Sequence, residues 1–346
     1  MAIAIKYSLF DIQNERKIHK GSIPRLGGVS FIPCILFAMT FSIGIFYKYI
    51  NESQYDGYYP NFLEYSLFVC GLLLIYLGGV KDDFIGIRYR HKFLIQILSA
   101  MFVVFSGLYI NNFCGFLYIY EVTPWIGISL TIITLVFVVN AMNLIDGMDG
   151  LAASISIFAL CIYGTLFLLH GIWVYAAFAF GTTGTLIPFF YYNMFGNAKK
   201  GHKLFMGDAG SQTLGFILGF LSIRYVYHMP EVMTPIGNAL VIAISPILIP
   251  MLDVMRVMLV RIKKRRHLFK ADRNHIHHKL LDMGLSKSFA LVVILSLNAT
   301  FCIINFILMQ HVNCTLIFLA DVIIWSVMNV CFSYAIKRKN VNEAVF

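Results

Sequence analysis

Long apolar runs alternate with short polar segments along the whole sequence. A bilayer core of about 30 Å needs roughly 20 apolar residues in a helix, because each residue rises about 1.5 Å. Short connectors such as Gly171 and residues 310–313 predict antiparallel neighbouring helices. Ten runs qualify approximately: 28–50, 63–80, 93–110, 122–141, 151–170, 172–192, 210–228, 234–256, 288–309 and 314–336. The pattern therefore predicts an all-α fold, a polytopic integral membrane helical bundle of about ten transmembrane helices.

The composition agrees with a membrane protein and excludes other classes. The 346 residues are 59% hydrophobic and 13% charged, whereas soluble domains contain about 25% charged residues. The seven cysteines form no CxxC pair, so they indicate neither a disulfide framework nor a zinc ribbon. The net charge of +10 lies between apolar segments rather than on a soluble basic face, which argues against nucleic-acid binding.

The basic residues indicate which way the spans point. With a cytoplasmic amino terminus, 25 of the 27 Lys and Arg residues fall in inner segments, and only Lys48 and Arg224 do not. The positive-inside rule then places both termini in the cytoplasm. We expect residues 1–346 to form a single membrane-embedded domain, with cytoplasmic loops at about 1–27, 81–92, 142–150, 193–209 and 257–287.

Acidic residues gather at the predicted inner ends of these spans. They are Asp82, Asp83, Asp146, Asp149, Asp208 and Asp253. An aspartate in the middle of a membrane helix costs about 2.5 to 3.5 kcal/mol on insertion scales, so acids near apolar segments usually have a partner or a function. The same face carries the cations Lys81, Arg88, Arg90, Lys92 and Arg273 and three histidines. We expect a cytoplasmic-face pocket suited to a metal ion and phosphates.

Three of the acidic segments also have plain structural interpretations. Residues 77–86 could be an interfacial loop in which Asp82 and Asp83 make ordinary ion pairs. Residues 140–151 could form a calcium loop, but they lack the alternating oxygen ligands and closing glutamate of an EF-hand. Asp208 could simply be a helix N-cap, for which aspartate is favoured.

The fourth segment, residues 272–279, contains the histidines His275, His277 and His278. Zinc is an alternative, but this spacing contains no i, i+4 pair and no cysteine lies nearby. A basic loop touching anionic lipid is another. Beside a diphosphate, Arg and His would make charge-assisted hydrogen bonds, and the phosphates would favour protonated imidazole.

Together with residues 14–28, these four segments resemble the polyprenyl-phosphate N-acetylhexosamine-1-phosphate transferases. The similarity runs from about Asp11 to Ser288. Residues 272–278 resemble the bacterial branch that uses UDP-N-acetylglucosamine and undecaprenyl phosphate, rather than the muramoyl-pentapeptide branch. Members of this branch usually carry one more span before the first loop, whereas residues 1–10 precede that loop here.

The resemblance implies an enzyme that transfers N-acetylhexosamine 1-phosphate, with GlcNAc favoured, from the UDP-sugar to undecaprenyl phosphate. UMP would be released and lipid-linked cell-surface glycan synthesis started, at the cytoplasmic face of the bacterial inner membrane. Mg²⁺ is the implied cofactor, with Mn²⁺ as an alternative. Asn143 and Asp208 match the metal-holding positions, and Phe205 matches an aromatic residue that stacks on uracil. Residues 147–149 (Gly147, Met148 and Asp149) match the uracil-binding turn.

The resemblance also implies phosphate-binding groups. Asp82 and Asp83 match paired acids near the lipid phosphate, and Lys92 matches a phosphate-binding lysine. The loop that holds the sugar diphosphate is matched by Arg273, His275, His277 and His278. Asp146 matches a motif acid grouped here with the catalytic residues. We expect direct attack by the lipid phosphate, since its second pKa is near 6; a base or covalent nucleophile at Asp82 or Asp83 is the alternative.

Two rival classes fit the sequence less well. An ion-coupled transporter would hold its acids near the bilayer midplane, where only Asp321 is a candidate, with Arg224 as one partner. A CDP-alcohol phosphotransferase would need its own clustered aspartate motif, which the sequence does not contain. The UDP-sugar epimer and the oligomeric state are not determined by the sequence, and a homodimer stays open.

Overall fold

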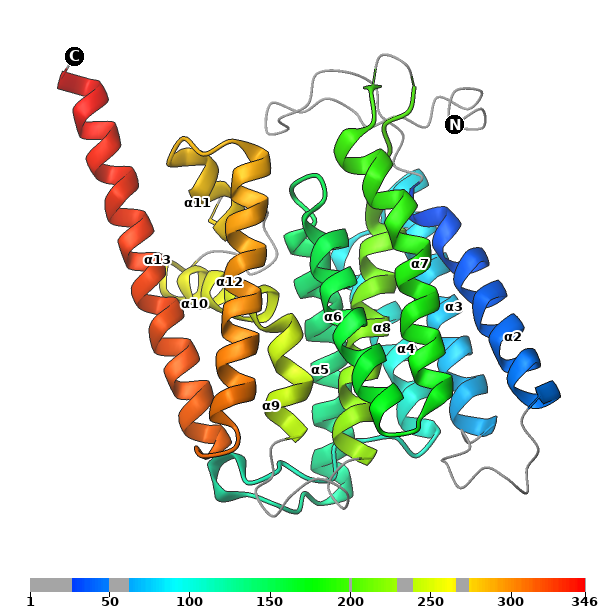
Figure 1. Ribbon diagram of the computed structural model, residues 1–346. Helices are drawn as coiled ribbons and strands as arrows, with labels where there is room; N and C mark the ends of the chain where they lie inside the picture. The colour runs from blue at the N-terminus through cyan, green and yellow to red at the C-terminus, as the bar shows by residue number, and fades with distance from the viewer. Residues whose placement is uncertain (1–26, 50–61, 199–200, 229–238, 266–273, 346) are drawn as a thin grey trace. The chain divides into compact units, whose positions relative to one another are not determined.

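The computed structural model describes residues 27–49, 62–198, 201–228, 239–265 and 274–345. This part of the chain is helical (Figure 1). Within it, the β-pairing consists of one isolated bridge between Asn112 and Glu121. The chain divides into two compact units. Unit 1 comprises residues 1–109 and 128–224, and unit 2 comprises residues 110–127 and 225–346.

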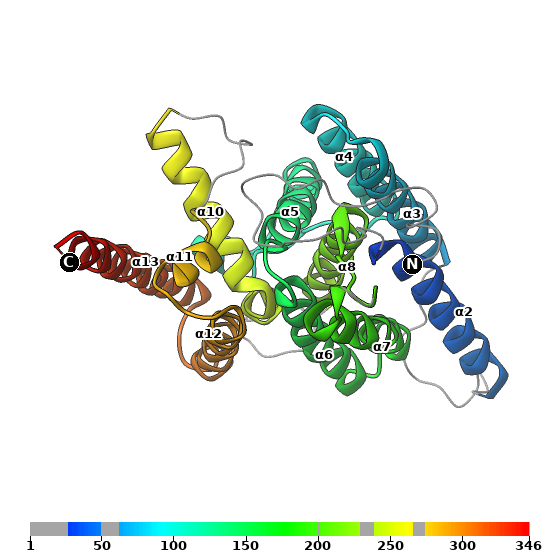
Figure 2. The ribbon, with the colours of Figure 1, turned by 90° about the horizontal axis from the view of Figure 1, so that it is seen from above.

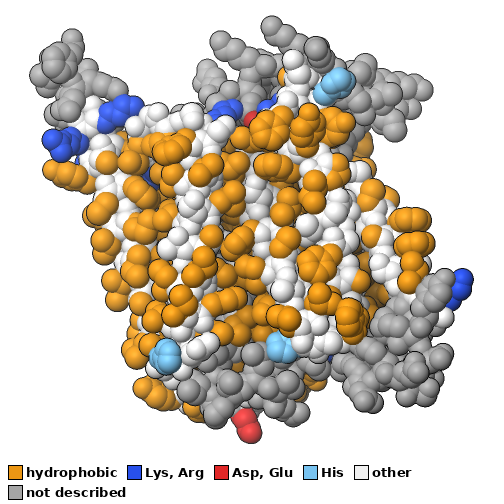
Figure 3. Space-filling view, viewed as in Figure 1, with side chains coloured by type: hydrophobic (Ala, Val, Ile, Leu, Met, Phe, Trp, Pro, Cys, Tyr) orange, Lys and Arg blue, Asp and Glu red, His pale blue; other side chains and the backbone are white. Residues whose placement is uncertain are grey.

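Eight helices in the described part are long and apolar enough to cross a membrane. They cover 28–45, 62–85, 124–145, 151–169, 173–195, 239–263, 287–308 and 314–339. The other two predicted spans also lie on helices: α4 (Tyr89–Phe105) has 17 residues, and α8 (Gly207–His228) carries Asp208 and Arg224. Hydrophobic side chains cover the flanks of the helices in Figure 3. The protein is a multi-pass, all-helical membrane protein, which confirms the predicted fold class.

Unit 1 contains the helices that surround α8. After the short η1 (Gly28–Ser30), these are α2 (Phe31–Tyr49), α3 (Phe62–Ile85), α4, α5 (Pro124–Ile145), α6 (Leu151–Leu169) and α7 (Trp173–Phe195). Figure 2 shows α8 among α3, α5 and α7. The rings of Phe68 and Phe220 stack with centroids 3.9 Å apart, and Phe178 meets Phe68 edge-on at 5.3 Å. These rings hold α3 and α7 against α8.

The end of unit 1 that carries the acids depends on close backbone approaches. A Cβ atom at Gly79 would lie 2.5 Å from Cα of Ala209, so only glycine lets α3 come this near the start of α8. On another side, the backbone nitrogens of Gly27 and Gly28 donate to the carbonyls of Phe205 and Met206, both at 2.9 Å. The glycines in the predicted motifs therefore bring α3, η1 and α8 together.

Unit 2 contains η3 (Phe116–Tyr118), α9 (Ala239–Ile244), η5 (Ser245–Ile247), α10 (Leu248–Lys263), α11 (Ile276–Asp282), α12 (Lys287–Leu308) and α13 (Cys314–Val345). The predicted span at 234–256 is broken at η5, and α9 and α10 run in different directions (Figures 1 and 2). Pro246 explains the break, because proline cannot donate a helical hydrogen bond. Asn298 of α12 satisfies the freed groups: it donates to the Pro246 carbonyl at 2.9 Å and accepts from the Ile249 nitrogen at 3.3 Å.

A buried ion pair joins α3, α7 and α8 at the end of unit 1 opposite the acids. Nε of Arg224 lies 2.8 Å from Oε1 of Glu64, which also accepts the hydroxyl of Tyr175 at 2.5 Å. Arg224 is 1% exposed and lies over the Tyr175 ring. The structure thus pairs Arg224 with Glu64, whereas Asp321 accepts a hydrogen bond from Asn305 at 3.0 Å.

Candidate functional site

The paired acids of α3 have different tasks, and Asp83 caps α8. Its Oδ1 accepts the backbone N–H of Asp208 at 2.8 Å, and its Oδ2 accepts that of Ala209 at 2.9 Å. The first N–H groups of a helix lack helical partners and carry the positive end of the helix dipole, so a carboxylate there is stabilising. The N-cap interpretation offered for Asp208 is therefore corrected: Asp83, from another helix, provides this cap.

Asp82, the second acid of the pair, holds Lys92. The Asp82 carboxylate accepts the Ile87 backbone N–H at 2.6 Å and forms an ion pair with Nζ of Lys92. The same Nζ lies 3.6 Å from Oδ1 of Asp208. The short segment between α3 and α4, together with the first turn of α4, therefore places one cation between two acids. Lys92 is partly exposed, with 28% of its side chain accessible.

Asn143, in the last turn of α5, lies beside Asp208. Its Nδ2 donates to Oδ1 of Asp208 at 2.5 Å and to Oγ of Ser211 at 2.8 Å. The Ser211 hydroxyl in turn donates to the Gly207 carbonyl at 3.0 Å. Both side-chain bonds use the amide nitrogen, which leaves the amide oxygen of Asn143 as the atom suited to a cation.

Residues 146–150 form the tight turn between α5 and α6, in which Gly150 has a φ of +78°. The Gly150 N–H donates to Oδ1 of Asn193 at 2.6 Å, and Nδ2 of Asn193 donates to the Leu204 carbonyl at 2.8 Å. Lys203 forms an ion pair with Asp149 at 2.9 Å. Asn193 and Lys203 were not predicted as members of the site; their only signal was a position inside the predicted inner loop 193–209.

Asp146 of this turn lies among other carboxylates. Burial and the neighbouring carboxylates of Asp208, Asp149 and Asp83 raise the pKa of Asp146 well above its usual value. Within the turn Met148 is buried and Gly147 is exposed. Unit 1 thus brings together Asp82, Asp83, Lys92, Asn143, Asp146 and Asp208, with Asp149 in the adjoining turn, while the half-buried Phe205 lies beside the start of α8.

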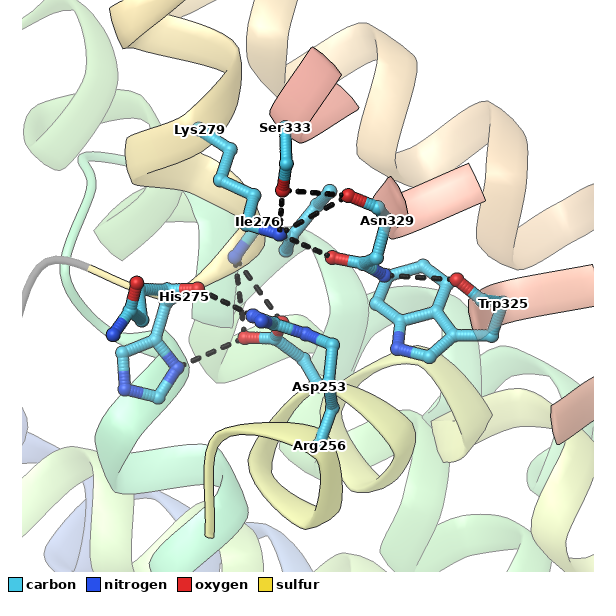
Figure 4. Close-up of polar contacts among 9 residues, drawn as sticks. Asp253, Arg256, His275, Ile276, Lys279, Trp325, Asn329 and Ser333 are labelled. Carbon is cyan, nitrogen blue, oxygen red and sulfur yellow. Dashed lines mark hydrogen bonds and ion pairs between the residues drawn. The ribbon is translucent and has the colours of Figure 1, made fainter. Parts of the chain in front are cut away.

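The histidine segment belongs to unit 2, and Arg273 lies outside the described residues. His275 precedes α11, and its Nδ1 is 2.9 Å from Oδ2 of Asp253 (Figure 4). His277 is 1% exposed, and neither of its ring nitrogens has a hydrogen-bond partner among the described residues. Burial, aided by His278 and His275, lowers the pKa of His277 to about 3. This imidazole is therefore neutral at pH 7, unlike the protonated state expected beside phosphates.

The three imidazoles stack on one another. The ring centroids of His275 and His277 are 5.9 Å apart, and those of His277 and His278 are 4.2 Å apart. In the described ranges, no group of three or more His, Cys, Asp or Glu side chains is arranged to hold a metal ion. A magnesium site commonly has one or two protein ligands and is completed by substrate phosphates, so it does not need a group of three such side chains.

Comparison with known proteins gives the family. Residues 65–226 match the family described as glycosyl transferase family 4. The undecaprenyl-phosphate alpha-N-acetylglucosaminyl 1-phosphate transferase of Yersinia pestis is 29% identical over 299 residues, covering 84% of this chain and 74% of that protein. Its namesake from Escherichia coli (strain K12) is 29% identical over 295 residues, with the same two coverages. Nothing in these matches supports an ion-coupled transporter.

The chain is a multi-pass membrane protein with a polar site at the ends of its helices. The site contains several carboxylates, the amide of Asn143 and the ammonium group of Lys92. Residues 65–226 match the model of glycosyl transferase family 4, and 84% of the chain is similar to undecaprenyl-phosphate alpha-N-acetylglucosaminyl 1-phosphate transferases. The resemblance drawn from the four motif segments is confirmed.

Proposed function

We propose that the protein transfers N-acetylglucosamine 1-phosphate from UDP-GlcNAc to undecaprenyl phosphate and releases UMP. The names of its relatives supply the lipid and the sugar. The observation that carries the proposal is the contact of Asn143 and Lys92 with one carboxylate, that of Asp208. Asp208 and Asn143 provide oxygen ligands for a metal ion, and Lys92 beside them provides a positive charge for a phosphate. A reaction between two phosphates requires both.

The donor set fits Mg²⁺, with Mn²⁺ as an alternative. Asp208 and the amide oxygen of Asn143 are hard oxygen donors, and Mg²⁺ is commonly held by one or two protein oxygens together with substrate phosphates. When bound, the ion would neutralise charge on the diphosphate. Asn143 is oriented for this role because Ser211 fixes its amide nitrogen.

The contacts of the paired acids favour direct displacement. Both oxygens of Asp83 accept backbone N–H groups of α8, and Asp82 accepts Ile87 and Lys92, so neither side chain is poised as a nucleophile. An oxygen of the lipid phosphate would form the new bond to the β-phosphorus of UDP-GlcNAc. The bond from that phosphorus to the bridging oxygen would break, and UMP would leave with this oxygen. Lys92 would bind the phosphates, and Asp82 would orient it.

The remaining motif residues would bind the donor. Phe205 and the turn formed by Gly147, Met148 and Asp149 would hold the uridine, with Lys203 keeping Asp149 in place. Arg273 and the imidazoles of His275, His277 and His278 would hold the sugar diphosphate. Asp146, whose pKa is raised by burial and by the neighbouring carboxylates, would act beside Asp208 as a carboxyl group that takes up a proton more readily than an ordinary aspartate.

A reconstituted reaction tests the function. Purified protein is incubated with undecaprenyl phosphate, Mg²⁺ and, in separate reactions, UDP-GlcNAc, UDP-GalNAc, UDP-glucose or UDP-MurNAc-pentapeptide, and UMP and lipid product are measured. We expect UMP only with UDP-GlcNAc or UDP-GalNAc, loss of activity in EDTA and recovery with Mg²⁺ or Mn²⁺. Absence of UMP with every donor, while the E. coli relative is active in parallel, would refute the proposal.

The site would face the cytoplasm of the bacterial inner membrane. This orientation rests on the 25 of 27 basic residues assigned to inner segments. Cysteines placed at His202 and at Arg265 should react with a membrane-impermeant maleimide only after the cells are permeabilised. Labelling of either cysteine from outside intact cells would reverse the orientation.

A further inference from the structure

Asp253 is a buried carboxylate in α10 that no step of the proposed reaction uses. It is 0% exposed. Its carboxylate meets Nδ1 of His275 at 2.9 Å and Nη2 of Arg256 at 2.9 Å, and it accepts the backbone N–H of Ile276 at 3.2 and 3.3 Å (Figure 4). A buried carboxylate left without such partners would be strongly unfavourable. Asp253 therefore fixes the side chain before α11 and the first residue of α11 at once.

Neighbouring contacts hold the same segment on both sides. Arg256 also donates to the Asn274 carbonyl, so side chains of α10 contact two consecutive residues of the segment, Asn274 and His275. On the other side, Nζ of Lys279 donates to the Asn329 carbonyl at 3.3 Å, to Asn329 Oδ1 at 3.2 Å and to Ser333 Oγ at 3.0 Å, all on α13 (Figure 4). The histidine segment is thus held between α10 and α13 by polar contacts.

The contact of Asp253 with His275 has a chemical consequence. An ionised carboxylate can only accept hydrogen bonds, so the Nδ1 that it faces carries a proton. The second ring nitrogen, Nε2, is left for another partner. If Nε2 also carries a proton, it can donate to a phosphate, and the Asp253 carboxylate offsets the charge of the ring. Histidines held in this way by a carboxylate have a fixed tautomer and a fixed orientation.

We propose that Asp253 is a positioning residue of the transfer reaction, which binds Nδ1 of His275 and so presents Nε2 to the sugar diphosphate. This inference rests on the proposed function, because it requires the histidine segment to bind the donor. Asp253 itself touches no substrate. Its effect is therefore expected on donor binding and not on the lipid acceptor.

Steady-state kinetics of Asp253→Asn give the first test. The isosteric amide removes the charge that holds Nδ1–H, and removal of such a supporting group typically costs about 10- to 100-fold. We expect KM for UDP-GlcNAc to rise about 10-fold or more, with KM for undecaprenyl phosphate unchanged within about 2-fold. The matched control is Asp321→Asn, a second buried aspartate of unit 2 whose partner is Asn305; it should leave both KM values unchanged.

Substitutions of His275 separate the two ring nitrogens. The amide of asparagine reaches about as far as Nδ1, and that of glutamine about as far as Nε2. His275→Asn should keep the contact with Asp253 yet lose donor affinity, and His275→Gln should retain more of it. Adding Asp253→Asn to either variant should cost little further donor affinity, because Asp253 acts on the donor only through the imidazole of His275, which both variants lack. Full additivity would overturn the proposal.

A measurement independent of turnover completes the test. In protein with ¹⁵N-labelled histidine, the His275 signals, assigned by their loss in His275→Asn, should show a protonated Nδ1 that changes in Asp253→Asn. An unprotonated Nδ1 in the wild-type protein overturns the inference, even if Asp253→Asn does not fold. If the wild-type protein releases no UMP, the proposed function fails; if it does, and Asp253→Asn has wild-type kinetics or raises both KM values equally, only the inference fails.

Discussion

The two units compensate their buried charges in opposite ways. The cluster in unit 1 contains five carboxylates, of Asp82, Asp83, Asp146, Asp149 and Asp208, and Lys92 and Lys203 form ion pairs with it in the described part of the chain. In unit 2, the single carboxylate of Asp253 meets Arg256 and His275. An excess of carboxylates favours a bound cation, whereas an excess of cationic groups favours a bound anion. The composition of the unit 1 cluster agrees with the proposed cation at Asn143 and Asp208.

The same contrast distinguishes how single groups are held. Asp83 accepts hydrogen bonds from two backbone N–H groups of α8, while Asp253 contacts the side chains of Arg256 and His275 as well as the backbone N–H of Ile276. Burial and the nearby charge of Arg256 lower the pKa of Lys279 to about 8, so its ammonium group loses a proton more readily than that of an exposed lysine.

The largest expected effect comes from removing the acid at the centre of the unit 1 cluster. Asp208→Ala should lower kcat on the order of 10⁴-fold, because the metal supplies several kcal/mol of charge stabilisation, and should abolish Mg²⁺-dependent binding of UDP-GlcNAc. His277→Ala should weaken donor binding without changing which metal supports turnover. UMP release and titration calorimetry measure both. Stoichiometric zinc in the purified protein, lost in His277→Ala and needed for activity, would place the metal in unit 2 instead.

The second effect concerns the buried ion pair of Glu64 and Arg224, at the other end of the unit 1 helices. Arg224→Met leaves the carboxylate of Glu64 buried without its cation, and breaking a buried pair typically costs about 3 to 5 kcal/mol. We expect a large drop in thermal stability in detergent. The double variant Glu64→Leu with Arg224→Met should recover most of it, since no uncompensated charge remains. Equal losses in the single and double variants would show that the pair is not the source of stability.

A smaller effect separates the two acids of α3 from Asp208. Asp82→Asn should lower activity about 10- to 100-fold, because Lys92 loses the carboxylate that orients it, and should retain more activity than Asp208→Asn. Kinetics on the two variants at equal expression test this order. A radioactive phosphoprotein trapped from β-labelled UDP-GlcNAc without lipid, and lost in Asp82→Asn or Asp83→Asn, would establish a covalent route.

The smallest effect concerns the raised pKa of Asp146. Its pKa is raised in the folded protein, so above the ordinary aspartate pKa of about 3.9 the folded state binds more protons than the unfolded state. Stability therefore falls as the pH rises through this window, and asparagine removes that loss. Asp146→Asn should raise Tm by about 2 to 4 °C at pH 8, with the gain shrinking towards pH 5, while activity falls. A gain independent of pH would exclude the charge as its cause.

The helices were predictable because membrane spans leave a long apolar signal, and the described part of each predicted run is largely helical. The break at Ser245–Ile247 was not predicted, since apolar runs look the same whether the helix is straight or bent. What makes the break tolerable is Asn298, about 50 residues further along the chain. Periodicity reports burial, but it does not report which distant amide will satisfy a carbonyl.

The site divides in the same manner. The acidic motifs were recognisable because each lies at the end of an apolar run. Unit 1 brings together those that contain Asp82 and Asp83, Asp146 and Asp149, and Asp208, whereas Asp253 lies in unit 2. That Asp83 caps α8 was not readable, because capping was sought within the same segment and came from a helix 125 residues earlier. Asn193 was missed since an amide at the end of an apolar run carries no motif. Pairings across the fold are set by tertiary packing, which a local pattern cannot encode.

The pair of Glu64 and Arg224 also has a consequence for how the chain is made. An arginine is among the least favourable residues for insertion into a bilayer, and α8, which carries it, is not among the eight strongly apolar helices of the described residues. Glu64 and Tyr175 leave the ribosome before Arg224 does, so both partners in α3 and α7 can be in the membrane when α8 arrives. Insertion of α8 is then expected to depend on these earlier helices, and Glu64→Gln should leave a fraction of newly made chains with α8 outside the bilayer.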